Sequence, residues 1–264
     1  MPEDRARVLA ALERLAPLEL AEDWDNVGLL VDARVGPEGF ARAFLTVDLT
    51  AQTLEEAIAI RADLIVAYHP PIFSGLKRLR RGPMAERLIL EAIERGLTIY
   101  SPHTALDAAG GGMAEWLAFA CGPGQLRPVV RSAHDPALGA GRVITLETAL
   151  SLTEAVQRIK HHLDLDRVRV ASPEPSILVR TMAVCPGAGG ALFQEVGQVD
   201  LLLTGEMRHH DLLARTATGT AVVLTDHSNC ERGYLPVLAG RLLEACPGLE
   251  VVVSRVDADP LTIV

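Results

Sequence analysis

The sequence lacks the features that mark several classes of protein. Its 264 residues include four cysteines, Cys121, Cys185, Cys230 and Cys246, and no two of them are spaced as CxxC. This usage argues against a disulfide framework or a zinc–cysteine site and fits thiols in a reducing cytosol. No apolar run approaches the roughly 18 residues of a membrane-spanning helix, and the charged N-terminus has no apolar signal segment. We therefore expect a cytoplasmic protein that does not enter the membrane.

Net positive charge is also absent. Lysine and arginine total 25 against 34 aspartate and glutamate residues, a formal net charge of −9. Because phosphate backbones are bound by a basic face, this balance argues against nucleic acid as the main partner. The one dense basic run, Lys77-Arg78-Leu79-Arg80-Arg81, has two interpretations: it is a solvated surface, or it guides an anionic ligand.

The sequence does contain a regular alternation of strand and helix patterns. Hydrophobic residues make up 49% of the chain, enough to bury a sizeable core. Strands are expected at residues 27–31, 42–47, 64–67, 97–100, 142–146, 168–170, 178–184, 201–203, 221–224 and 249–253. Helices are expected at residues 4–16, 51–60 (with Asp48 or Thr50 as cap), 83–95, 113–120, 152–163, 190–196, 207–215 and 233–245. This order predicts an α/β protein with mixed sheets flanked by helices.

A weak internal repeat divides the chain into two similar halves. Residues 63–69, DLIVAYH, resemble residues 200–206, DLLLTGE, and the next strand in each half ends in a histidine, His103 or His227. This pattern predicts two lobes that arose by internal duplication. The stretch 122–141 is rich in glycine and proline, so we place the boundary there, with an N-terminal lobe at 1–125 and a C-terminal lobe at 126–264.

Metal-type ligands follow four of the expected strands. They are His69 after Tyr68, His103 with Asp107, Glu206, and His227 with Glu231. Ligands gather at the carboxyl ends of strands in α/β sheets, and imidazole and carboxylate together suit Zn, Mn, Fe or Co. Residues four apart project from one face of a helical turn, so each His–acid pair can approach one cation or two adjacent ones. The alternative for each pair is a hydrogen bond at a helix entry. We expect the metal site at the interface between the lobes.

Other polar residues give weaker signals. His209 and His210 follow Glu206 and are either groups that support metal ligands or residues near a helix cap. The loop at residues 186–190, PGAGG, either cradles a phosphate or forms a tight turn, and it does not match GxGxxG. Cys230 is either a nucleophile or an inward-facing apolar residue.

Five stretches together resemble a known family, the Nif-three-like dinuclear-metal-centre hexameric proteins, often labelled GTP cyclohydrolase I type 2 homologues. The stretches are WDNVGL at 24–29, YHPPIF at 68–73, HTALD at 103–107, TGEM at 204–207 and HSNCERG at 227–233. They run in family order over nearly the whole chain. The resemblance implies a two-lobed α/β fold and a homohexamer. Some relatives carry an inserted domain between the lobes, and this chain is too short for a full one.

The resemblance also implies site residues. His69 and Asp107 match ligands of one metal, His227 matches a ligand of a second, and Glu231 matches a bridge between them. Glu206 and His103 match pocket residues near the metals and are the acid–base candidates. Many bacterial members have a second histidine where this chain has Tyr68, so the chain is expected to hold one or two divalent ions.

The implied activity is metal-dependent hydrolysis of an unidentified small molecule, with a nucleotide or cyclic purine as the substrate that the family label suggests. The alternative is a non-enzymatic metal-binding ring that acts as a scaffold, metallochaperone or regulator. A DNA-binding ring is disfavoured by the net charge.

Overall fold

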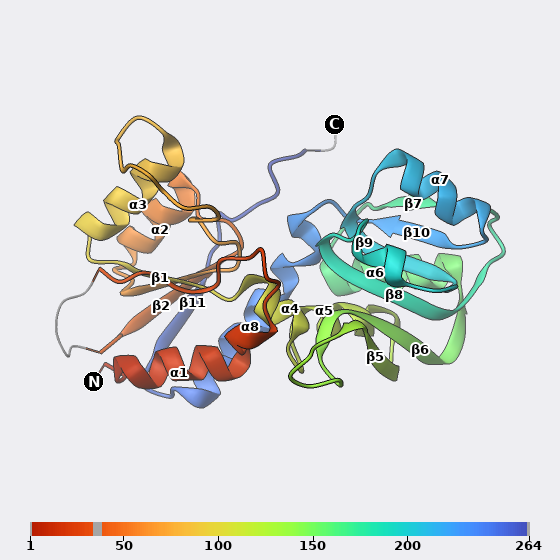
Figure 1. Ribbon diagram of the computed structural model, residues 1–264, viewed down its shortest axis with the longest axis horizontal. Helices are drawn as coiled ribbons and strands as arrows, with labels where there is room; N and C mark the ends of the chain where they lie inside the picture. The colour runs from red at the N-terminus through yellow and green to blue at the C-terminus, as the bar shows by residue number, and fades with distance from the viewer. Residues whose placement is uncertain (1, 34–38, 263–264) are drawn as a thin grey trace. The chain divides into compact units, whose positions relative to one another are not determined.

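The computed structural model describes residues 2–33 and 39–262 of the chain, which form two compact units (Figure 1). Unit 1 comprises Met1–Leu106 and Leu235–Ala258, and unit 2 comprises Asp107–Tyr234 and Asp259–Val264. These limits differ from lobes at 1–125 and 126–264, because the chain returns to unit 1 after residue 234 and adds a helix and a strand there. Local patterns do not reveal such a return.

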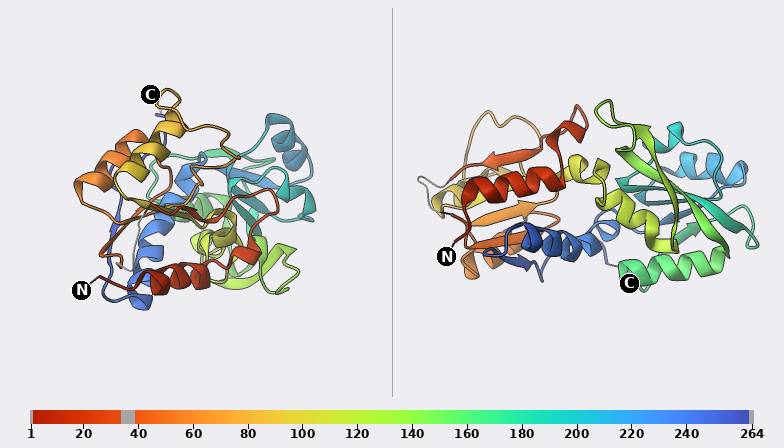
Figure 2. Two further views of the ribbon diagram at one scale, coloured as in Figure 1. Left: turned by 60° about the vertical axis from the view of Figure 1, so that its left-hand side comes forward. Right: turned by 90° about the horizontal axis from the view of Figure 1, so that it is seen from below.

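Unit 1 is built on a five-stranded sheet with strand order β1-β4-β3-β2-β11. The strands are β1 (Gly28–Val31), β2 (Arg42–Thr46), β3 (Leu64–Ala67), β4 (Thr98–Ser101) and β11 (Glu250–Val253). Only β1 runs antiparallel to its neighbour. Helices α2 (Ala51–Ala59) and α3 (Met84–Glu94) cover one face, where Leu54 and Ile89 pack on Phe44 and Ile65. Figure 2 shows α1 (Arg5–Leu15) beside α8 (Leu235–Ala245) on the other face.

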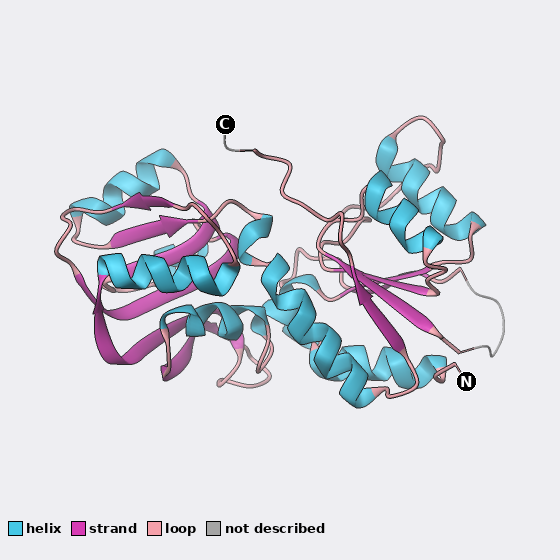
Figure 3. Ribbon diagram, turned by 180° about the vertical axis from the view of Figure 1, so that it is seen from behind, coloured by secondary structure: helices cyan, strands magenta, loops and turns pink. Residues whose placement is uncertain are grey.

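Unit 2 is built on a six-stranded sheet with strand order β5-β6-β8-β9-β10-β7. The strands are β5 (Gly124–Arg131), β6 (Gly139–Ser151), β7 (Arg169–Ala171), β8 (Leu178–Ala188), β9 (Leu201–Glu206) and β10 (Ala221–Leu224). Helices α5 (Met113–Ala118) and α6 (Leu152–Leu163) bury one face of this sheet (Figure 3). The 3-10 turn η3 (Leu192–Glu195) and α7 (His209–Ala217) cover the other face, where Phe193 and Leu212 meet Val143 and Leu202.

The expected boundary at residues 122–141 is instead part of this sheet. It contains β5, which pairs with β6 in an antiparallel hairpin. Its glycines serve close strand packing: a Cβ on Gly124 would lie 2.4 Å from the carbonyl oxygen of Thr145, and one on Gly139 would lie 2.0 Å from that of Val130. The glycine-rich composition that suggested a lobe boundary is explained instead by glycines such as Gly124 and Gly139, which lie where backbones approach closely.

The internal duplication is confirmed by the topology. In unit 1, β2, β3 and β4 are parallel neighbours and the earlier strand β1 adds antiparallel to β4. In unit 2, β8, β9 and β10 repeat this arrangement, and the earlier strand β7 adds antiparallel to β10. The aspartate that opens each repeat has the same role. Asp63 accepts hydrogen bonds from the backbone of Ala41 and Arg42 at 2.6 and 2.9 Å, and Asp200 accepts from Arg180 and Thr181 at 2.9 and 2.7 Å.

Most expected elements are present within two or three residues of their predicted ends. Two differ in type. Residues 190–196, predicted as a helix, contain the 3-10 turn η3, and the predicted helix 233–245 starts as the 3-10 turn η5 (Arg232–Tyr234) before α8. Helix α4 (His103–Ala108), predicted only as a helical turn, follows β4 directly. Among the described residues, none of the helices is long and apolar enough to cross a membrane.

Candidate metal centre

Three of the predicted site residues are histidines, and all three hold a carboxylate in the same way. His69 Nδ1 lies 2.9 Å from Asp48 Oδ1, His103 Nδ1 lies 2.8 Å from Asp25, and His227 Nδ1 lies 2.8 Å from Glu206 Oε1. An ionised carboxylate only accepts hydrogen bonds, so each Nδ1 donates and the lone pair of the neutral ring is on Nε2. This arrangement is typical of histidines that ligate metal ions.

His69 is placed by the parallel pairing of β2 and β3. The ladder continues past the strand ends, with Tyr68 N–H donating to Thr46 O at 2.9 Å and His69 N–H donating to Val47 O at 3.0 Å. Asp48 therefore stands at the same sheet edge as His69. Thr50, rather than Asp48, caps α2, and its side chain accepts from the backbone of Thr53. The Asp48 carboxylate is thus available to orient the His69 ring.

His103 is held by a more deeply buried carboxylate. The Asp25 side chain is fully buried and accepts hydrogen bonds from His103 Nδ1 and from both the backbone and hydroxyl of Thr104. Burial alone would raise the pKa of Asp25, but the hydrogen bonds from His103 and Thr104 outweigh it and lower that pKa. Asp25 is therefore ionised at neutral pH. His103 has a left-handed φ of 26°, so its backbone conformation is strained. Its ring is fixed by the hydrogen bond to Asp25.

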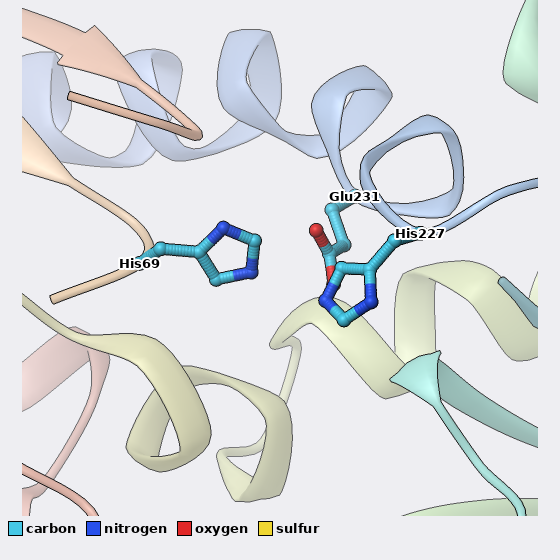
Figure 4. A group of neighbouring side chains, drawn as sticks. All are labelled: His69, His227 and Glu231. Carbon is cyan, nitrogen blue, oxygen red and sulfur yellow. The ribbon is translucent and has the colours of Figure 1, made fainter. Parts of the chain in front are cut away.

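His227 and Glu231 stand together in unit 2, as Figure 4 shows. The pairing of β9 and β10 extends into this loop, where Asp226 N–H donates to Gly205 O at 3.0 Å and Asp226 has a φ of 66°. The short turn η4 (Ser228–Cys230) then brings Glu231 back, so that its Oε1 lies 3.7 Å from His227 Nε2. Glu231 is buried, with 1% of its surface exposed. A buried carboxylate beside an Nε2 lone pair is a typical start of a metal site.

A glycine makes the room for this pair. A Cβ on Gly187 would lie 2.9 Å from both Glu231 Oε1 and His227 Nε2, and its φ of 60° favours glycine. The backbone amides of this loop bind inside unit 2: Gly187 N–H donates to Cys230 Sγ at 3.2 Å and Gly189 N–H donates to Thr204 Oγ1 at 2.9 Å. Loop 186–190 is therefore a tight turn against the candidate ligands, and these amides are not directed at a phosphate.

Of the two interpretations of Cys230, the structure supports the inward-facing apolar residue. It is fully buried, and burial, with the Glu231 charge as a further cause, raises the pKa of its thiol well above the usual value. A protonated, enclosed thiol is a poor nucleophile.

Glu206 stands beside a hollow. Its carboxylate, over half exposed, accepts from His227 and borders a cavity of about 470 Å³. The cavity is lined by Ala188, Gly190, Ala191, Gln194, Glu206, Met207, Arg208 and Asp211. His209 and His210 begin α7 with exposed side chains whose rings contact one another at 5.6 Å. In the described contacts, neither of these two rings touches a residue of the candidate site.

The remaining residues singled out by the sequence are Asp107, the first residue of unit 2, and Tyr68, in unit 1. Asp107 lies in α4, one turn after His103, and is partly buried. Tyr68 is buried, and its ring centroid lies 5.0 Å from that of His69 and 5.5 Å from that of His103, so it forms a wall beside both histidines.

The basic run at residues 77–81 is exposed and takes part in surface ion pairs. Arg80 pairs with Glu86, with Nε donating to Oε2 at 2.9 Å, and Arg81 pairs with Glu94. Of its two interpretations, the contacts support a solvated surface.

Two partners were not foreseen. Asp25 belongs to the WDNVGL stretch and Asp48 is a candidate helix cap in the sequence, yet both orient histidines. A signal existed for Asp48, which follows β2 at the edge where β3 ends in His69. None existed for Asp25, which meets His103 across 78 positions of sequence.

His227 and Glu231 thus make a candidate pair of metal ligands in unit 2 of an internally duplicated α/β protein, and His69 in unit 1 has its ring oriented in the same way. A family model described as Duf34/NIF3 (NGG1p interacting factor 3) matches residues 4–260. The chain belongs to this family.

Relatives agree over nearly the full length. NIF3-like protein 1 of Drosophila melanogaster is 39% identical over 98% of this chain and 89% of its own. NGG1-interacting factor 3 of Saccharomyces cerevisiae is 36% identical over 97% of this chain and 96% of its own. A solved Bacillus cereus protein related to NIF3 has the same fold, with a TM-score of 0.90, full coverage of both chains and 18% identity.

Proposed function

We propose that this protein is a metal-dependent hydrolase with a divalent metal centre whose ligands are His69, Asp107, His227 and Glu231. The observation that carries the proposal is the carboxylate on Nδ1 of each candidate histidine, because it directs the lone pair to Nε2. One or two ions per chain fit this donor set, and imidazole with carboxylate suits Zn, Mn, Fe or Co.

The residues fit such an ion by their own chemistry. Glu231 supplies a buried negative charge 3.7 Å from His227 Nε2, and Gly187 leaves the space in front of both. When bound, a divalent ion acts as a Lewis acid that polarises a carbonyl or phosphoryl oxygen of the substrate.

His103 is the proposed acid–base residue. Its Nδ1 proton is held by the ionised Asp25, so Nε2 can accept a proton from an attacking water and later return it to the leaving group. Glu206 acts as a positioning residue: it orients the His227 ring and stands at the rim of the cavity beside it. We propose a nucleotide or a cyclic purine as substrate.

Turnover on a panel of nucleotides tests this proposal. Purified protein loaded separately with Zn, Mn, Fe or Co should release product, and the matched Glu231→Gln variant should lose both metal and turnover. Turnover that equals this control for every nucleotide and metal would contradict the hydrolase.

The second candidate is a non-enzymatic metal-binding ring that acts as a scaffold, metallochaperone or regulator. It is favoured by the name of the yeast relative, which records an interaction of that protein with NGG1. Affinity capture from a cytoplasmic extract separates the two: partners that are lost from Glu231→Gln, without any turnover in the wild type, support the scaffold.

We further propose that the chain works in the cytoplasm as a homohexamer. Light scattering should give about six times the chain mass of 28.3 kDa. A monomer at micromolar concentration would contradict this assembly.

A further inference from the structure

Unit 1 exposes two large aromatic side chains beside one another. Aromatic residues make up only 4% of the chain, and most of them are buried. Trp24 and Phe73 are the two most exposed of the described aromatic residues, with 59% and 56% of their surfaces exposed, and their ring centroids lie 5.9 Å apart. Leaving such rings in water forgoes the free energy that their burial would provide.

The pair is connected to the candidate acid–base residue. The Trp24 ring meets the His103 ring edge-on, with centroids 6.0 Å apart, and His103 meets His69 in the same manner at 5.4 Å. The rings therefore form a continuous series from the exposed surface of unit 1 to a candidate metal ligand. A group lying on Trp24 would stand next to His103.

The pair is also held in place before any ligand arrives. The Asn26 side chain donates to the backbone oxygen of Ile72, which ties the segment carrying Trp24 to the segment carrying Phe73. Asp25, between Trp24 and Asn26, is anchored on Thr104 and His103. A rigid aromatic surface loses little conformational entropy on binding, which is the condition for effective stacking.

We infer that Trp24 and Phe73 form a stacking subsite for a flat heteroaromatic ring of the substrate. The link to a reaction rests on the proposed function, because His103 is the reactive neighbour. The exposed area could instead be covered by a second copy of this chain. The ring series toward His103 and His69 favours a small planar ligand, since a subunit contact does not require a path to these histidines.

Adenosine and ribose are the probes that test the subsite. Binding is followed by saturation-transfer NMR on metal-free protein, so that neither metal nor turnover is needed. Wild type should bind adenosine and should not bind ribose. Trp24→Ala should weaken adenosine binding about 5- to 150-fold, the range for removing one stacked aromatic side chain, and Trp24→Phe should restore part of it. Phe119→Ala is the matched control, since Phe119 is an exposed phenylalanine in unit 2 and its loss should change nothing.

Equal adenosine binding by wild type and Trp24→Ala would overturn the subsite. So would a smaller assembly of Trp24→Ala in light scattering, because it would show that a second copy covers the ring. The two proposals fail separately. Adenosine binding without any nucleotide turnover keeps the subsite and removes the hydrolase. Turnover with an unchanged KM in Trp24→Ala keeps the hydrolase and removes the subsite.

Discussion

The two units share a strand arrangement but hold their histidines by different means. In unit 1, His69 and His103 each take a carboxylate from outside the repeated strand–helix–strand segment, Asp48 and Asp25. In unit 2, Glu206 stands at the repeat position of His69 and pairs directly with His227, the counterpart of His103. The two units therefore share a sheet edge at which polar side chains stand, while the side chains themselves differ.

The environments of these pairs differ as well. Asp25 has a fully buried side chain, whereas the side chains of Glu206 and His227 are 56% and 41% exposed. The Asp25–His103 pair is therefore enclosed by protein, whereas the Glu206–His227 pair is in contact with solvent.

The largest effect is expected from Glu231→Gln. The change keeps the shape of the side chain but removes the buried charge beside His227, and the family resemblance implies that Glu231 would contact both ions. Metal affinity should fall by more than about 100-fold, beyond the 10- to 100-fold of changes around the ligands. Asp107→Asn, which affects one ion, should lose less. Elemental analysis measures this, and full occupancy in Glu231→Gln would remove the bridging role.

Comparing the free energies of unfolding of Asp25→Asn and Glu206→Gln sharpens the contrast between the buried pair and the exposed pair. Asp25→Asn weakens charge-assisted hydrogen bonds to His103 and Thr104, so the free energy of unfolding should fall by about 2–3 kcal/mol. Glu206→Gln should change it by less than about 0.5 kcal/mol, because the group is at the surface. Urea unfolding of both variants gives the comparison. Equal losses would mean that burial does not separate the two pairs.

Gly187→Ala tests whether the space that this glycine leaves beside His227 and Glu231 is needed for metal binding. The left-handed φ of 60° costs a residue with a Cβ about 1–2 kcal/mol, and the new methyl group would press on His227 and Glu231. Gly190→Ala is the control, since its nearest neighbour, Asp211 Oδ2, would lie at an ordinary 3.5 Å. Calorimetric titration with Zn should show weaker binding for Gly187→Ala alone. Identical Zn titrations of the wild type and Gly187→Ala would show that this space is not needed for metal binding.

The smallest effect concerns His162, away from the site in unit 2. Burial lowers the pKa of His162, whose ring stacks on Trp116 at 4.3 Å. As the pH falls below about 6.5, the unfolded chain takes up this proton first. Stability should therefore decline toward acid by at most about 1.4 kcal/mol per pH unit, until the folded form also titrates.

His162→Phe keeps the stack and should flatten this part of the pH profile. His134→Phe, in an exposed loop, should leave the profile unchanged. Thermal melts between pH 5 and 7 measure both, and an unaltered slope in His162→Phe would assign the acid response to other groups.

Much of this architecture was predictable because it depends on local sequence patterns. The apolar strands, the helices between them and the repeated DLIVAYH and DLLLTGE segments predicted the duplicated α/β fold, which the topology and the family confirm. The sequence indicated His69, His227 and Glu231 as candidate ligands because parallel strands bring their carboxyl ends to one edge of each sheet.

The rest depended on contacts that local patterns do not contain. The return of α8 and β11 to unit 1 and the meeting of Asp25 with His103 both join distant segments. Strand β5 was missed for a different reason, because glycine and proline mark both linkers and closely packed strand pairs, and Gly124 belongs to the second kind.

The central claim is that histidines with Nδ1 held by a carboxylate present Nε2 to a divalent metal. Anomalous diffraction from a crystal of the Zn-loaded protein tests it most directly. We predict an ion bound by Nε2 of His69 and His227 and by the Glu231 carboxylate, with Asp48 and Glu206 still on Nδ1. An ion bound away from these residues, or one that displaces a carboxylate to reach Nδ1, would contradict the account.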